Sequence, residues 1–84
     1  MVPSQVADDL ITIVKRVNPQ PNEPTLDSAL VADLGFDSLR LLELIAEMED
    51  HFNVFIPLNE VPAIKTVGQA VAHVTALLET QGRQ

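Results

Sequence analysis

Three stretches of this sequence repeat apolar residues three and four apart, the spacing of one face of an α-helix. A helix with one apolar face is stable when that face packs against other elements, so the pattern predicts an all-α bundle. The three apolar stripes consist of Val6, Leu10, Ile13, Val14 and Val17, then of Leu41, Leu44, Ile45, Met48 and Phe52, and last of Val67, Val71, Val74 and Leu78.

Residues 18–37 separate the first two predicted helices and contain three prolines, so they cannot form one continuous helix. The pair Asn18-Pro19 ends the first helix. We expect a short helical turn over residues 28–33. Three leucines are predicted to reach the core from this segment: Leu26, Leu30 and Leu34. A connection of this length allows the first two helices to lie nearly parallel.

Residues 52–57 follow the second helix and are rich in apolar side chains, but they form too short and isolated a segment for a sheet. We therefore predict an apolar loop that Phe55 and Ile56 fix to the core. Residues 58–64 have room for one helical turn, whose length Pro62 limits.

The last helix is predicted to start at Thr66, which forms a capping box with Gln69, and Gly82 is suited to end it. The sequence has 84 residues and no internal repeat, which indicates a single domain over residues 1–84.

The composition excludes several classes of function. The chain has no cysteine, and therefore no disulfide, no thiolate metal site and no catalytic thiol of its own. A net charge of −7 argues against nucleic acid as a partner and suits docking onto basic protein surfaces. No apolar run reaches membrane-spanning length and no signal peptide is visible, so we expect a cytoplasmic protein that does not bind membranes.

The most informative short motif is Leu34-Gly35-Phe36-Asp37-Ser38-Leu39, a glycine turn that brings one serine to the start of a helix. This helix is predicted to run from Ser38 to about His51. The Asp37 side chain is suited to cap the exposed N–H groups, and the helix dipole favours negative charge at this end. A phosphate ester on Ser38 would therefore lie where the helix tolerates an anion best. Taken alone, however, Asp-Ser before an apolar run is also ordinary helix-start chemistry.

Together with its surroundings, this motif resembles the phosphopantetheine attachment site of acyl carrier proteins. The resemblance covers about residues 4–80. The matching residues are Asp33-Leu34-Gly35, Asp37-Ser38-Leu39, Glu43, Leu44, Glu47, Met48, Phe52, Phe55-Ile56-Pro57, Glu60 and Thr66-Val67.

The resemblance implies a four-helix acyl-carrier-like bundle, with three long helices and one short one, that has no enzymatic activity. In that family the serine, here Ser38, carries a 4′-phosphopantetheine arm, and acyl groups are held on the terminal thiol. A phosphopantetheinyl transferase would recognise the site, Asp37 included, and transfer the arm from coenzyme A with the help of Mg²⁺.

The resemblance also implies partners and a docking surface. The partners would be acyl-loading and acyl-processing enzymes, which a monomeric, stand-alone carrier would meet on the second helix. The expected contact residues are Leu39, Arg40, Glu43, Ala46 and Glu47. Two alternatives stay open on the sequence alone, an aminoacyl or peptidyl carrier and a helical interaction domain that is never modified.

Two competing chemistries find no support. A serine hydrolase would need a histidine beside Ser38, but thirteen residues of helix place His51 about 20 Å away. His73 is not excluded by distance, but the chain contains no Gly-x-Ser-x-Gly motif. A calcium-binding loop of the EF-hand pattern is also absent.

Three residues depart from the pattern of the family. Many fatty-acid carriers have an acidic residue where this chain has Arg40, which can instead pair with Glu43 one helical turn away. Leu58 also stands where an acidic residue is frequent, and Pro62 lies in the short helix. These departures favour a specialised, polyketide-like or fatty-acid-like pathway.

Overall fold

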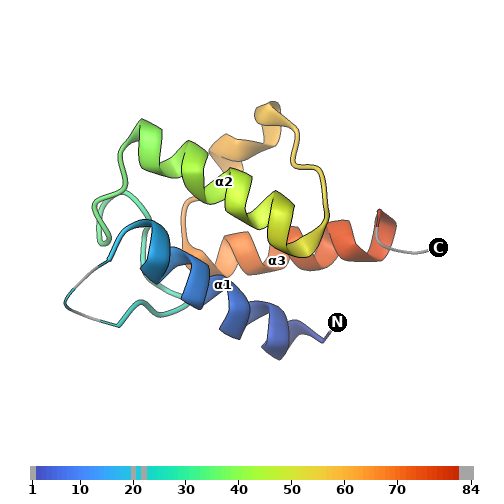
Figure 1. Cartoon of the computed structure of the whole chain (residues 1–84), viewed down its shortest axis with the longest axis horizontal. Coiled ribbons are helices and arrows are strands. Elements are labelled where there is room, and N and C mark those ends of the chain that lie inside the picture. The colour runs from blue at the N-terminus through green and yellow to red at the C-terminus, as the bar shows by residue number, and fades with distance from the viewer. Residues whose placement is uncertain (1, 20, 22, 82–84) are drawn as a thin grey trace.

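The computed structural model of the protein describes residues 2–19, 21 and 23–81. Within these residues four helices follow one another: α1 (Pro3–Val17), α2 (Ser38–Phe52), the 3₁₀ helix η1 (Leu58–Ala63) and α3 (Val67–Thr80). Figure 1 shows α1 and α3 crossing below α2, with η1 in the connection between α2 and α3. The predicted bundle of three long helices and one short helix is therefore confirmed.

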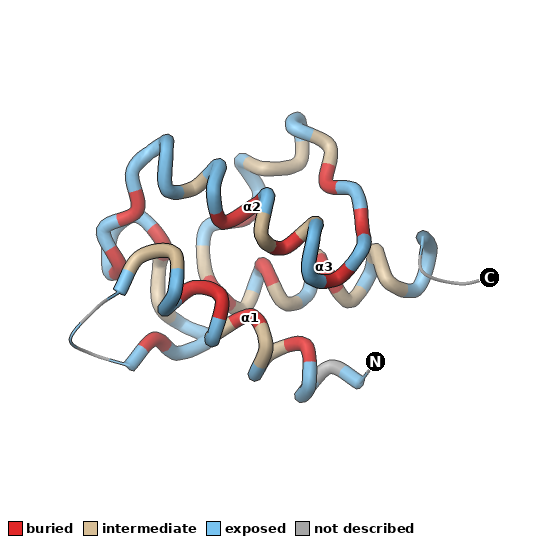
Figure 2. The backbone as a smooth tube through the Cα atoms, in the orientation of Figure 1, coloured by how far each residue is buried: buried red, intermediate tan, exposed pale blue. Residues whose placement is uncertain are grey.

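The core lies where the apolar faces of the three long helices meet, as the buried positions in Figure 2 show. All three predicted stripes contribute to it. Within them, Val17, Leu41, Val71 and Leu78 are only partly buried and pack at its edge. The fully or nearly buried members are Val6, Leu10, Ile13, Val14, Leu44, Ile45, Met48, Phe52, Val67 and Val74.

The first two long helices run in opposite directions, so the predicted near-parallel arrangement is wrong (Figure 1). Arg40 at the start of α2 donates to the carbonyl oxygen of Val17 at the end of α1, at 2.6 Å. His51 at the end of α2 lies 3.1 Å from the Asp9 carboxylate, closer to the start of α1. The 18–37 connection therefore leaves α1 and returns to the same end of it, so that its length does not serve to cross the bundle.

The later part of this connection, residues 26–36, packs on the core. Leu30 and Leu34 are buried as predicted, but Leu26 is 46% exposed and the prediction for it is wrong. Leu26 instead contributes its backbone, because its carbonyl oxygen accepts from the N–H of Gly68 at 2.8 Å. An isolated antiparallel bridge between Ala29 and Thr66 continues this attachment to the start of α3.

The segment after α2 alternates between core and solvent. Val54 and Ile56 are buried, whereas Phe55 is 65% exposed. In an extended chain, neighbouring side chains point to opposite sides, so Phe55 and Ile56 cannot both enter the core. The prediction is confirmed for Ile56 and wrong for Phe55. The Gln81 side-chain amide holds Phe55 by its backbone, accepting from its N–H at 2.7 Å and donating to its carbonyl at 3.0 Å.

The predicted capping box at the start of α3 is confirmed. The Thr66 hydroxyl accepts from the Gln69 N–H at 3.1 Å, and the Gln69 side chain accepts from the Thr66 N–H at 3.0 Å. At the other end the C-cap is Gln81, and Gly82, predicted to end the helix, lies outside the described residues. None of the helices in the described part of the chain is long and apolar enough to cross a bilayer.

Candidate functional site

A tight turn over residues 30–36 brings the chain to the start of α2. The N–H of Gly35 donates to Val31 O at 3.1 Å and that of Phe36 to Leu30 O at 2.9 Å. Gly35 has a φ of 71°, a left-handed conformation that favours glycine. The chain changes direction at this turn, and the side chain of Phe36 enters the core, where it is 2% exposed. The sequence-based core assignment missed Phe36, which fixes the position of the next two residues.

The side chain of Asn18 connects this turn to α1. Its Nδ2 atom donates to the carbonyl oxygen of Leu34 at 2.7 Å. Asn18 is also the C-cap of α1, with its own N–H donating to Val14 O at 3.0 Å. One residue therefore ends the first helix and holds the turn that precedes the second, which keeps the start of α2 beside the end of α1.

Ser38 is the first residue of α2, directly after the N-cap Asp37. The Asp37 carboxylate accepts from the Arg40 N–H at 2.8 Å, and its backbone carbonyl accepts from Leu41 N–H at 2.9 Å, so the predicted cap is confirmed. Ser38 and Leu39 are both exposed, and in the described part of the chain their backbone N–H groups and the Ser38 hydroxyl find no partner. The site thus presents a free hydroxyl beside two free N–H groups.

This arrangement fits the phosphate end of a phosphopantetheine group. A phosphodiester oxygen is an acceptor, and the unpaired N–H groups at a helix N-terminus are donors that also favour its negative charge. Arg40 adds a cation two residues from the hydroxyl. The partly exposed guanidinium is fixed beside the end of α1 by Val17 O at 2.6 Å and by the Glu43 carboxylate at 3.7 Å.

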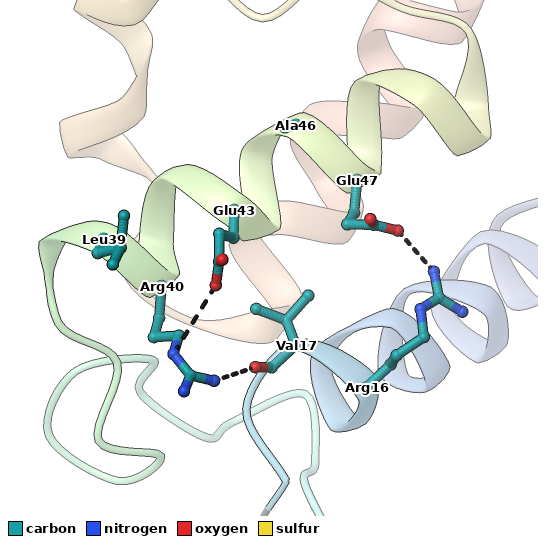
Figure 3. Close-up of a pocket in the computed structure, with 7 residues that line it drawn as sticks. All are labelled: Arg16, Val17, Leu39, Arg40, Glu43, Ala46 and Glu47. Atoms are coloured by element: carbon teal, nitrogen blue, oxygen red, sulfur yellow. Dashed lines mark hydrogen bonds and ion pairs between the residues drawn. The ribbon is translucent and has the colours of Figure 1, made fainter.

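The five predicted docking residues lie together along one side of α2 (Figure 3). Leu39, Arg40, Glu43, Ala46 and Glu47 all line an open groove of about 590 Å³, whose other wall is formed by Arg16 and Val17 of α1. The predicted Arg40–Glu43 pair is present. The sequence does not indicate that Arg16 and Val17 belong to this groove, because they face α2 only when the two helices are packed.

A charged pair closes the groove at its other end. Arg16 Nη2 lies 2.7 Å from Glu47 Oε1, with both side chains about half exposed (Figure 3). Both glutamates among the five predicted docking residues are therefore paired with an arginine of the same chain, Glu43 with Arg40 and Glu47 with Arg16. Exposed pairs of this kind contribute only about 0.2–1 kcal/mol, so a partner can displace either arginine.

A second groove, of about 480 Å³, lies beside Leu41 and is almost entirely apolar. It is bordered by residues 29–32 of the connection and by η1. The described residues that form its walls are Ala29, Leu30, Val31, Ala32, Leu41, Val61, Pro62 and Ile64, with Lys65 as the one charged residue among them. Two grooves of opposite character therefore flank the start of α2.

Neither histidine belongs to a hydrolytic site. His51 pairs with Asp9, and His73 pairs with Glu60 of η1 at 2.5 Å. Both imidazoles thus connect neighbouring elements of the bundle, and neither of them contacts Ser38.

The structure thus has the helical bundle that the resemblance to acyl carrier proteins implies, with a free Ser38 hydroxyl at the capped start of α2. Comparison with known proteins gives the same result. A family model described as the phosphopantetheine attachment site matches residues 8–74. The acyl carrier protein of Amoebophilus asiaticus is 46% identical over 61 residues, which cover 73% of this chain and 76% of that protein.

Longer alignments and a solved structure agree. The acyl carrier protein of Rhodococcus erythropolis is 33% identical over 81 residues, 95% of this chain and 88% of that protein. A structure described as an acyl carrier protein from Mycobacterium tuberculosis superimposes with a TM-score of 0.80 at 35% identity, covering 84% of this chain and 96% of that one. The chain belongs to the acyl carrier protein family.

Membership of this family defines the chemistry in general terms. The protein is a carrier and not an enzyme, and its prosthetic group is a covalently attached phosphopantetheine. The thiol of that group supplies the nucleophile that a chain without cysteine lacks. Its partners are biosynthetic enzymes.

Proposed function

We propose that Ser38 is the residue that carries the 4′-phosphopantetheine arm. This proposal rests on one observation: the Ser38 hydroxyl is free at the first position of α2, next to unpaired N–H groups and the Asp37 cap. The enzyme that attaches the arm is a phosphopantetheinyl transferase, with coenzyme A as donor. Asp37 is part of the surface that this transferase recognises.

Modification by a purified transferase tests the attachment site. The unmodified protein is incubated with coenzyme A, Mg²⁺ and a broad-specificity phosphopantetheinyl transferase, and the intact mass is recorded. The wild type should gain one phosphopantetheine group and Ser38→Ala none. Ser4→Ala is the matched control, because Ser4 is an exposed serine in the first turn of α1, and it should be modified like the wild type. A wild type whose mass stays unchanged with several transferases contradicts the proposal.

We further propose that the groove side of α2 is the surface on which partner enzymes dock. Leu39 is 66% exposed, and an exposed leucine beside charged side chains is a common composition for a transient protein contact. The cell compartment that fits this role is the cytoplasm, where the acyl-loading and acyl-processing enzymes would meet a monomeric carrier.

The pathway we propose is a specialised one rather than general fatty-acid synthesis. Support comes from the surface that a partner would meet. Arg40 places a cation where many family members have an acid, and Leu58 places an apolar side chain, 75% exposed, where an acid is also frequent. Like charges disfavour a partner built for an acidic residue, which gives specificity.

A reversal of charge at position 40 tests this proposal. Phosphopantetheine-loaded Arg40→Asp is assayed with a general fatty-acid synthase enzyme, and its turnover should exceed that of the loaded wild type. Lys15→Asp makes the same change in net charge at an exposed residue that pairs with Glu23 outside the groove, and it should leave turnover unchanged. Equal turnover for wild type and Arg40→Asp means that Arg40 has no part in the choice of pathway.

A further inference from the structure

We propose that the groove between α1 and α2 is the resting site of the phosphopantetheine arm when the arm carries no hydrocarbon cargo. In this arrangement Arg40 pairs with the phosphodiester, and the charged walls of the groove bind the amide groups of the arm. The inference rests on attachment at Ser38 and adds to it the path that the arm takes over the protein.

The groove begins at the attachment site. Leu39 and Arg40, the two residues that follow Ser38, line its near end, and Glu47 with Arg16 lines its far end (Figure 3). A group tethered to Ser38, the residue directly before Leu39, therefore starts close to this end of the groove. Because the tether keeps the arm close, the local concentration of the arm is high even if each contact is weak.

Arg40 retains donors for the phosphodiester. A guanidinium carries five N–H donors. One N–H of Nη1 is bonded to Val17 O, and Nε faces Glu43, which leaves the second Nη1 hydrogen and both Nη2 hydrogens. Charge-assisted hydrogen bonds from a guanidinium to a phosphate oxygen are among the stronger ones in proteins. The hydrogen bond to Val17 O also holds the side chain at the entrance of the groove, so that less rotamer freedom is lost on binding.

The chemistry of the walls fits the arm. Phosphopantetheine contains two amides, a hydroxyl and a pair of methyl groups, so it needs donors, acceptors and small apolar surfaces. The groove supplies carboxylates from Glu43 and Glu47, guanidiniums from Arg16 and Arg40, and the apolar surfaces of Leu39, Val17 and Ala46.

The second groove does not offer such hydrogen-bond partners. Among the described residues its walls are apolar apart from Lys65, and moving an amide from water to such a surface without a hydrogen-bond partner is energetically costly. Two amides would double this cost. The free-thiol arm is therefore expected to prefer the groove between α1 and α2, since there its polar groups find partners.

Backbone amide shifts in ¹H–¹⁵N NMR spectra test the assignment. Spectra of the unmodified protein and of the protein that carries the free-thiol arm are compared, after intact mass has established complete modification. We expect shift changes at Val17, Glu43 and Glu47 that exceed those at Val31 and Ile64 of the apolar groove. Nuclear Overhauser effects from the methyl groups of the arm to Val17 and Ala46 should accompany them.

Two variants separate a specific site from proximity alone. Arg40→Gln removes the cation and should lose most of the arm-induced shift changes at Glu43 and Glu47. Lys15→Gln removes a cation from the same end of α1 but outside the groove and should preserve them. The ³¹P resonance of the phosphodiester should move in the first variant only.

The possible failures are distinguishable. A fully modified protein whose shift changes are confined to residues 36–40, or are larger at Val31 and Ile64, overturns the groove assignment while attachment at Ser38 stands. Arm-induced changes that survive Arg40→Gln overturn the role of Arg40. A wild type that gains no mass overturns the attachment proposal, and the groove assignment with it.

Discussion

Replacement of Leu44 by alanine should destabilise the protein strongly, because Leu44 is completely buried in the α2 face that packs on the core. The change removes three carbon atoms, and at about 0.8 kcal/mol per buried methylene this corresponds to about 2.4 kcal/mol of lost transfer free energy. The cavity left behind adds to this, so that leucine-to-alanine changes in cores reach about 5 kcal/mol. The expected loss is therefore about 2–5 kcal/mol.

Leu42→Ala is a matched control on the same helix. The two variants change the same residue type and therefore alter helix propensity equally, but Leu42 is 54% exposed. About half of the transfer term then applies, close to 1 kcal/mol, and no cavity forms because water occupies the space. The difference between the two variants thus measures burial alone.

Urea denaturation followed by far-ultraviolet circular dichroism is the appropriate assay, since the chain contains no tryptophan or tyrosine for fluorescence. Both changes are made in the Ser38→Ala background, so that modification cannot differ between samples. With a slope of about 1 kcal/mol per molar urea, Leu44→Ala should lower the midpoint by about 2 M or more. A loss at Leu44 no greater than that at Leu42 would refute the assignment of the helical faces.

Two further changes test the ends of helices. Asp37→Ala should cost about 1 kcal/mol in unfolding free energy, whereas Asp37→Asn, which retains a capping oxygen, should cost much less; equal losses would show that the cap is not the cause. Gly68→Ala should lower the melting temperature although alanine is the better helix former, because its Cβ atom would lie 2.9 Å from the carbonyl oxygen of Leu26, and a higher melting temperature would contradict this.

Local chemistry in the sequence was sufficient to predict the helices and the proposed attachment site. Helical spacing identified the buried residues of α1 and α2 and, in α3, Val67 and Val74, since a helical face repeats every 3.6 residues along the sequence. The Asp37 cap and the Thr66–Gln69 capping box were predictable for the same reason, because each involves atoms within one turn of helix.

The errors occurred where the direction of a side chain depends on distant contacts. Leu26 and Phe55 are as apolar as their buried neighbours, but the backbone of each is held by another element, Leu26 by Gly68 and Phe55 by Gln81. These attachments turn the side chains to solvent. Phe36 is buried because the left-handed Gly35 reverses the chain just before it.

The sequence by itself determined which residues form helices, which faces are apolar and which serine begins α2, because these properties depend on neighbours within a few positions. Only the tertiary structure decided that α1 and α2 run in opposite directions. That packing brings Arg16 to Glu47 and Val17 to Arg40 and so creates the polar groove beside Ser38. The residues of these two contacts are 31 and 23 positions apart in the chain, so no local sequence pattern indicates them. The contacts form only when packing of the core has fixed the two helices against each other.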